Sequence, residues 1–274
     1  MPRAYRGGMT DAYPRIASVT PRLRVVASTG STNADAVAGA AADPVGWPHL
    51  AVLLTADQRS GRGRLDRTWT TPAGAALAVS VLVRIPRIPV ERRGWVPLAA
   101  GAAMTRAVGA QLRATGHTVG LKWPNDVLVD GGKICGILAS VVPGEPDAVV
   151  IGSGVNTRMR AEDLPVPTAT SFAALEREVD EDQLIADYLV ALDEQLSALA
   201  RGGAGASGVR GEVEALCLTL GSDVRVSMPN GEVLLGRAQR LDDEGRLVVA
   251  AGADETAVSA GDVVHVRPDA ASRP

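Results

Sequence analysis

Short apolar runs separated by polar turns divide most of the chain into predicted strands and helices. Continuous apolar runs of four to eight residues predict buried strands, and apolar residues spaced three and four apart predict helices. We expect strands at 23–27, 50–56, 75–83, 119–122, 127–129, 134–142 and 148–152, and helices at 34–42, 95–112 and 182–199. A Ser or Thr before 34–42 is a normal helix N-cap, and Asp130-Gly131-Gly132 is a typical hairpin turn.

The C-terminal part of the chain has a different pattern. Five short strands are predicted there, at 223–228, 233–242, 246–250, 255–259 and 263–267. So many short strands in about fifty residues indicate a small barrel. The Gly-rich segment 201–208 before them predicts a linker, and residues 1–20, which lack a sustained period, predict a mobile N-terminus. We therefore expect a larger domain over 21–215 and a barrel over 216–270.

Composition excludes several classes of protein. The 274 residues carry a net charge of −3, so no basic excess points to a nucleic-acid partner. Too few residues precede the first strand for a helix-turn-helix. No apolar stretch is long enough for a membrane span, and no signal peptide is visible. Two distant cysteines and three scattered histidines form no disulfide framework and no metal site. We expect a cytoplasmic protein with no membrane partner.

Lysine is very rare in this chain. Of the 28 basic residues, only Lys122 and Lys133 are lysine, and the rest are arginine. Both lysines lie within one short window, next to two of the polar motifs described below. Lysine and arginine are not interchangeable where a compact charge must fit a tight site. This window is therefore the first place to look for chemistry.

Four polar motifs follow predicted strands. The loop 58–69 alternates glycine with arginine, which suits close backbone approach to an anion, although a solvated surface loop explains it equally well. Lys122–Asp126 (KWPND) combines a cation, an amide and a carboxylate, but is also good turn chemistry. Gly132–Leu138 places a lysine at the start of an apolar strand. Ile151–Asn156 ends a strand in Gly-x-Gly, without the following helix that a dinucleotide site needs.

Taken in order, these motifs and Ser31-Thr32-Asn33 resemble those of biotin protein ligases. The resemblance runs from about Val25 to Asn156 and again through the C-terminal strands. It implies an α+β fold, with a mixed β-sheet catalytic domain of the biotin/lipoate ligase (class II synthetase-like) type and a small SH3-like β-barrel. It also implies the form that lacks an N-terminal DNA-binding domain.

The family makes biotinyl-5′-AMP from biotin and MgATP and passes biotin to a lysine of a biotin carboxyl carrier domain of an acyl-CoA carboxylase. The resemblance therefore implies ATP and biotin as substrates, Mg²⁺ as the accompanying ion, and a monomer or weak homodimer. Positions that match the motifs imply a biotin site at Ser31, Thr32, Asn33, Gln58, Arg62, Gly63, Arg64, Lys133, Gly136 and Leu138. They imply an ATP site at Arg62, Arg64, Trp69, Lys122, Asn125 and Asn156. They imply catalytic roles for Lys133, Arg62, Arg64 and Asp126.

Two positions depart from the family pattern. Asp66 stands where the arginine loop usually has glycine, and a carboxylate there either weakens triphosphate binding or points to solvent. Cys135 stands where a small residue is common, and we expect it to pack rather than react. Two alternative functions stay open: a lipoate or octanoate protein ligase, and a non-catalytic sensor of biotin or biotinyl-AMP. The acidic balance and the few aromatic residues argue against an RNA-binding protein.

Overall fold

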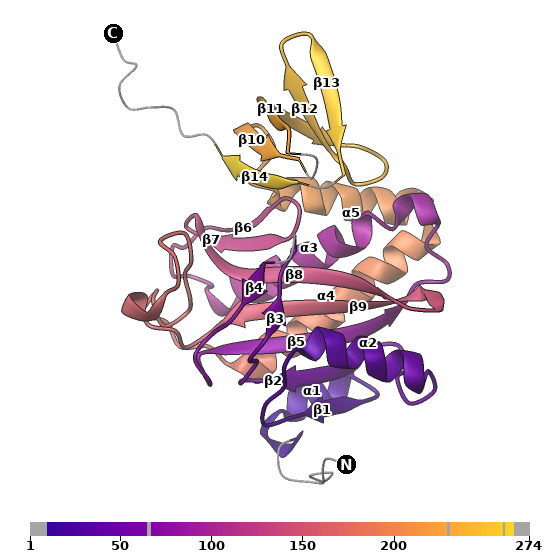
Figure 1. The fold of residues 1–274 in the computed structure, drawn as a ribbon, viewed down its shortest axis with the longest axis vertical. Helices are drawn as coiled ribbons and strands as arrows, with labels where there is room; N and C mark the ends of the chain where they lie inside the picture. The colour runs from indigo at the N-terminus through magenta and orange to yellow at the C-terminus, as the bar shows by residue number, and fades with distance from the viewer. Residues whose placement is uncertain (1–9, 65–66, 229–230, 260, 266–274) are drawn as a thin grey trace.

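A seven-stranded mixed sheet forms the centre of the larger domain in this computed structural model, which describes residues 10–64, 67–228, 231–259 and 261–265 (Figure 1). The strand order is β1 (Leu23–Val25), β2 (Ala51–Thr55), β5 (Ala76–Arg84), β9 (Glu145–Asn156), β8 (Gly132–Val142), β7 (Asp126–Val129) and β6 (Val119–Lys122). Only β1 and β2 pair in parallel; all other neighbours are antiparallel. The mixed sheet expected from the resemblance is confirmed.

Both faces of the sheet are covered, which explains why its central strands read as continuous apolar runs. On β5, alternate residues from Leu77 to Val83 join the main core with helices α3 (Trp95–Gln111) and α4 (Glu181–Arg201). Leu82 joins a smaller core on the other face, beneath helix α2 (Thr32–Ala42). Figure 1 shows α2 in front of the sheet, beside the short strands β3 and β4.

Two local features predicted from the sequence are present: the N-cap of α2 and the hairpin turn between β7 and β8. The Ser31 Oγ accepts a hydrogen bond from the Ala34 N–H at 3.3 Å, so Ser31 is the N-cap of α2. Strands β7 and β8 are joined at Asp130 and Gly131, whose φ angles of 48° and 83° are both positive. A two-residue hairpin turn of this kind matches the twist of the flanking strands, and Asp-Gly is one of its preferred sequences.

The mobile N-terminus predicted over 1–20 is wrong in its second half. Residues Thr10–Ala12 form a short 3-10 helix, η1, and Pro14–Val19 form helix α1, whose Ile16 is fully buried. The N–H groups of Arg15 and Ile16 each donate a 2.9 Å hydrogen bond to the carboxylate of Asp182 on α4. Because the capping carboxylate of α1 comes from Asp182, more than 160 residues away, the sequence around α1 does not itself indicate a helix.

The linker predicted over 201–208 is also wrong. Helix α5 (Gly203–Leu216) begins inside it and packs through Val209 and Val213 against α3 and α4. Gly202 and Gly203 have φ angles of 67° and 50°, which permit the sharp turn from α4 into α5. Tertiary packing therefore overrides the low helix propensity of this glycine-rich stretch.

A separate five-stranded antiparallel sheet forms the C-terminal domain, consistent with the expected SH3-like fold (Figure 1). Its order is β13 (Asp254–Val258), β12 (Leu247–Ala251), β11 (Val233–Leu241), β10 (Asp223–Ser227) and β14 (Asp262–His265). Two indole N–H groups attach its β11–β12 turn to the larger domain. Trp95 donates to the Asp243 carbonyl at 2.9 Å and Trp123 to the Gly245 carbonyl at 3.2 Å.

Two further short helices complete the described chain. They are the 3-10 helices η2 (Val90–Arg92), before α3, and η3 (Ala161–Asp163), after β9. The Asp57–Thr71 region contains a small hairpin of β3 (Gly61–Arg62) and β4 (Thr68–Trp69), rather than loop alone. This hairpin lies in front of the sheet (Figure 1), over strands that it does not pair with.

Candidate active site

A pocket opens on the face of the seven-stranded sheet between α2, the β3–β4 hairpin and the C-terminal domain. Its volume is about 160 Å³. Nearly all the residues assigned to the site from the sequence line it, and they come from four separate segments of chain. The assigned residues that line it are Ser31, Thr32, Asn33, Gln58, Arg62, Gly63, Arg64, Trp69, Lys122, Asn125, Asp126, Lys133, Gly136 and Leu138.

The floor of the pocket is bare backbone. Gly136 on β8 pairs with Gly154 on β9, and Gly152 lies two residues further along β9. A methyl group at Gly154 would lie 2.8 Å from the Trp69 indole, and one at Gly152 would lie 2.6 Å from the Asn33 amide nitrogen. Only glycine therefore lets these two side chains reach the sheet. The Gly-x-Gly motif is a floor for the site rather than a simple strand exit.

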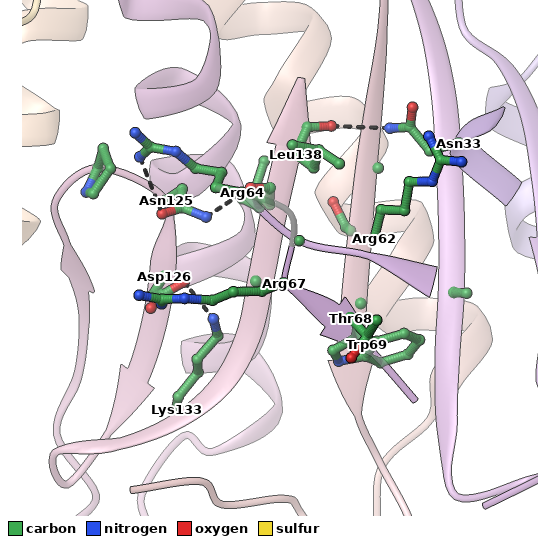
Figure 2. A pocket seen from close by; sticks show the side chains of 18 of the residues that line it. Asn33, Arg62, Arg64, Arg67, Thr68, Trp69, Asn125, Asp126, Lys133 and Leu138 are labelled. Atoms are coloured by element: carbon green, nitrogen blue, oxygen red, sulfur yellow. Dashed lines mark hydrogen bonds and ion pairs between the residues drawn. The ribbon is translucent and has the colours of Figure 1, made fainter. Parts of the chain in front are cut away.

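One wall is a network of buried hydrogen bonds around Gln58. Its Oε1 accepts from the Thr32 N–H at 2.8 Å and lies 3.1 Å from the Thr32 hydroxyl. The Ser80 hydroxyl on β5 donates to the Thr32 hydroxyl at 2.9 Å. Asn33 donates to the Leu138 carbonyl at 3.0 Å, across the pocket floor (Figure 2). These polar groups are held in place before any ligand is present.

The β3–β4 hairpin covers the opposite side and carries three arginines. Gly61 passes within contact of the Trp69 carbonyl, where a methyl group would lie at 2.4 Å. Arg62 points toward Asn33, whereas Arg64 and Arg67 point toward Asn125 and Asp126 (Figure 2). Arg64 Nη1 donates to Asn125 Oδ1 at 3.4 Å, which connects the hairpin to the KWPND turn. Asp66, the departure from the family pattern, lies outside the described residues.

The two lysines of the chain both line the pocket. Lys133 Nζ forms a 2.6 Å ion pair with Asp126 Oδ1, with 41% of the lysine side chain and 19% of the aspartate side chain exposed.

Asn125, in the KWPND motif, is fixed by hydrogen bonds from its backbone and its side chain. Its carbonyl accepts from the Ile137 N–H at 2.9 Å, and its Nδ2 donates to the Ile137 carbonyl at 2.8 Å. The motif therefore presents a cation and an amide from a rigid turn.

The C-terminal domain completes the pocket with Gly261 and Val263, which no sequence signal indicated. Its His265 has a pKa below the usual value because the ring is half-buried, and the positive charge of Lys122 lowers it further. Other lining residues missed by the sequence analysis, Arg67, Thr68 and Trp123, lie inside motifs that it singled out. The lining from the C-terminal domain depends on how the two domains sit together, which local patterns do not encode.

Two residues singled out from the sequence, Asn156 and Cys135, lie away from the pocket surface, as does Tyr188. Asn156 does not line it; its Nδ2 donates to the Thr170 carbonyl at 2.9 Å and so supports the segment after β9. Cys135 is buried below the floor, where burial raises the pKa of its thiol to about 12. Burial also raises the pKa of Tyr188, whose hydroxyl lies 3.2 Å from Ser153 Oγ under the same strand. The prediction that Cys135 packs agrees with its burial.

Two family profiles match the chain over both domains. The profile described as "Biotin/lipoate A/B protein ligase family" covers residues 42–156, and "Biotin protein ligase C terminal domain" covers 219–266. A biotin–[acetyl-CoA-carboxylase] ligase of Mycobacterium tuberculosis is 42% identical over 90% of both chains. The chain belongs to the biotin protein ligase family.

Two further similarities agree with this family. The bifunctional ligase/repressor BirA of Bacillus spizizenii is 30% identical over 72% of this chain and 61% of its own length. A structure of the biotin protein ligase from Aquifex aeolicus in complex with biotin and ATP superposes with a TM-score of 0.74. That structure is 21% identical, covers 90% of this chain and 100% of the other, and so supports the shared fold.

The described residues show neither a membrane-spanning helix nor a cluster of metal-ligating side chains. Among the described residues, none of the helices combines the length and hydrophobicity that crossing a bilayer requires. Within the same residues, no three His, Cys, Asp or Glu side chains come together as a metal site.

Proposed function

We propose that the chain joins biotin to a lysine of a biotin carboxyl carrier domain of an acyl-CoA carboxylase, using MgATP and passing through biotinyl-5′-AMP. The observation that carries the proposal is the Lys133–Asp126 ion pair, which faces a glycine floor and lies beside the arginine hairpin. A cation therefore lies between a stretch of sheet without side chains and a set of side chains that can bind anions. The named relative and the two family profiles support the same activity.

In the first step, a biotin carboxylate oxygen forms a bond to the α-phosphorus of ATP, and the bond to the β-phosphate oxygen breaks to release pyrophosphate. Two anions must approach each other, so cations have to neutralise them. We assign this role to Lys133 between the carboxylate and the α-phosphate, with Arg62 and Arg64 on the phosphates. Asp126 holds the Lys133 ammonium in place in advance, which avoids reorganisation during the reaction.

Biotin binding is assigned to the polar wall and the floor. Ser31, Thr32 and Gln58 present hydroxyl and amide groups that suit the ureido head, and Asn33 is tied to the floor through the Leu138 carbonyl. The bare backbone at Gly136 leaves space for the ring system above the sheet. Leu138 supplies apolar contact for the tail, and Gly63 lets the hairpin backbone approach the ligand closely.

Nucleotide binding is assigned to Lys122 and Asn125 on the KWPND turn and to Trp69 on the hairpin. Arg64 on the hairpin donates a hydrogen bond to Asn125, so a nucleotide that binds the KWPND turn also stabilises the hairpin over the pocket. Asn156 is assigned a supporting role through the Thr170 carbonyl. Mg²⁺ enters as part of MgATP, consistent with its preference for phosphate and water oxygens over a protein cage.

In the second step, the neutral amine of the carrier lysine forms a bond to the acyl carbon of biotinyl-5′-AMP, the bond from that carbon to the phosphate oxygen breaks to release AMP, and the amine nitrogen loses a proton to solvent. The mixed anhydride reacts readily with water, so the hairpin has to stay closed over it until the carrier arrives. Asp126 is the carboxylate in the described part of the pocket lining and is assigned to orient the incoming amine. The assignment is supported by its position beside Lys133, the residue assigned to the biotin carboxylate.

The test is pyrophosphate release with MgATP and either biotin or lipoate, with and without a carrier domain. We expect biotin-dependent release, transfer to one carrier lysine, and loss of both in Lys133→Ala. Preference for lipoate would assign the chain to the lipoate branch of the family instead. Tight biotin binding without release would refute the ligase assignment and favour a sensor of biotin.

A further inference from the structure

A buried threonine connects the C-terminal domain to the nucleotide side of the pocket. Thr219 is fully buried between α5 and β10. Its Oγ1 accepts a 3.0 Å hydrogen bond from the Trp123 backbone N–H and lies 3.1 Å from His265 Nε2. Thr219 and His265 stand near the two ends of the matched C-terminal domain, so the start and the end of this domain meet at the KWPND turn.

We propose that Thr219 is a positioning residue for nucleotide binding, acting through Trp123 on Lys122 and Asn125. The proposal rests on the proposed function, because it takes these two side chains as nucleotide ligands. Thr219 itself does not line the pocket, and its hydroxyl is already committed to Trp123 and His265.

The Thr219 hydroxyl can serve both of its partners at once. The Trp123 N–H occupies one lone pair of the hydroxyl, which leaves the second lone pair and the hydroxyl proton for His265 Nε2 in either tautomer of the ring. Burial lowers the pKa of His265, and the charge of Lys122 lowers it further, so the neutral ring is favoured. Cys217, also beside Thr219, stays a neutral thiol because burial raises its pKa. Hydrogen bonds therefore connect Trp123 through Thr219 to His265.

The same segment holds the strand that leads into the turn. β6 is an edge strand of the sheet, and Cys217 forms a parallel bridge with its Leu121. The Leu218 N–H donates to the Leu121 carbonyl at 2.8 Å, and the next bond is that from the Trp123 N–H to Thr219. Backbone groups on both sides of Lys122 are thus fixed by residues that follow α5. Loss of the Thr219 bond frees one side of Lys122 while leaving the biotin wall untouched.

The experiment compares Thr219→Val, which keeps the shape and removes the hydroxyl, with Thr219→Ser, which keeps the hydroxyl. We expect Thr219→Val to raise the KM for ATP about 5-fold, the effect of about one hydrogen bond, with the KM for biotin unchanged. Thr219→Ser should restore the KM for ATP to within about 2-fold of wild type. Thr105→Val is the matched control, because Thr105 is also buried but donates within α3, to the Gly101 carbonyl at 2.8 Å.

Amide hydrogen exchange at Trp123 gives a readout that does not need catalysis. Exchange should be faster in Thr219→Val than in wild type or Thr219→Ser. The inference would be overturned if Thr219→Val left the exchange of the Trp123 amide or the KM for ATP unchanged. It would also be overturned if Thr219→Val raised the KM for ATP and the KM for biotin equally, or if Thr219→Ser did not restore the KM for ATP. If Thr219→Val does not fold, His265→Ala removes the far partner alone and should give a smaller rise in the KM for ATP, whereas no rise would overturn it. A wild-type chain that releases no pyrophosphate would refute the proposed function, and the exchange measurement would still test Thr219.

Discussion

Replacing Gly154 by alanine should damage ligand binding without unfolding the protein. The added methyl would lie 2.8 Å from two atoms of the Trp69 indole, whereas carbon atoms in contact are normally about 3.5–4.0 Å apart. The ring therefore has to move away by about 1 Å. Gly154 lies in a central strand of the sheet, between β5 and β8, so the sheet is not the part that yields.

The β3–β4 hairpin yields instead, because in the described part of the chain its two short strands pair with each other and not with a strand of the seven-stranded sheet. Overpacking of this kind costs about 1–3 kcal/mol. If the hairpin moves away from the sheet to relieve this strain, a ligand can bind only when the hairpin returns to its strained position over the pocket. The cost then appears as a loss of affinity of about 5- to 150-fold rather than as a lower free energy of unfolding.

Isothermal titration calorimetry with biotin and with ATP measures the loss, and thermal unfolding checks that the fold is intact. Gly109→Ala is the matched control, because its methyl would contact nothing within 4 Å. Combining Gly154→Ala with Trp69→Ala should remove the penalty, since the clashing ring is gone. Wild-type affinity in Gly154→Ala, or the same penalty with and without Trp69, would refute the reasoning.

Four further predictions concern the charged and nucleophilic side chains. Lys133→Ala should slow biotin-dependent pyrophosphate release by about 100-fold or more, as loss of a transition-state cation does, and a smaller effect would show that Lys133 is not the central cation. Arg64→Ala, which loses the bond to Asn125, should shorten the retention of biotinyl-5′-AMP more than it weakens biotin binding; equal losses would contradict a lid role. With only Lys122 and Lys133 available, mass spectrometry should find little self-biotinylation at lysine, and extensive labelling would contradict this. Because burial raises the pKa of Cys135 to about 12, only about one thiol in 10⁴ is ionised at pH 8, so iodoacetamide should label Cys135 only after unfolding.

The elements that the sequence predicted well are those whose signal is local. β2 and β5 are continuous apolar runs because both faces of the sheet are covered, and α2 has its own N-cap in Ser31. Helices α1 and α5 were missed because distant contacts stabilise them. The Asp182 carboxylate caps α1, and packing on α3 and α4 holds the glycine-rich α5.

The residues of the candidate site also fall into those with a local sequence signal and those that depend on distant contacts. The site residues within the motifs could be identified because each motif is a short continuous segment. The resemblance to the family then implied a role for each of them. The glycine floor depends on the register of β8 against β9, which pairs Gly136 with Gly154. The contributions of Gly261, Val263 and Thr219 depend on where the C-terminal domain attaches. Neither relation has a local pattern, so neither was predictable from the sequence.

The lining of the pocket extends along the chain from Ser31 to Val263, and this has a consequence during synthesis. Ribosomes add about 5–20 residues per second, and domains generally fold as they emerge. The seven-stranded sheet is complete once β9 has been made, but the wall at β14 is among the last parts of the described chain to be translated. A nascent or prematurely terminated polypeptide therefore lacks a closed site. The pocket is therefore complete only in a chain that has been translated as far as β14.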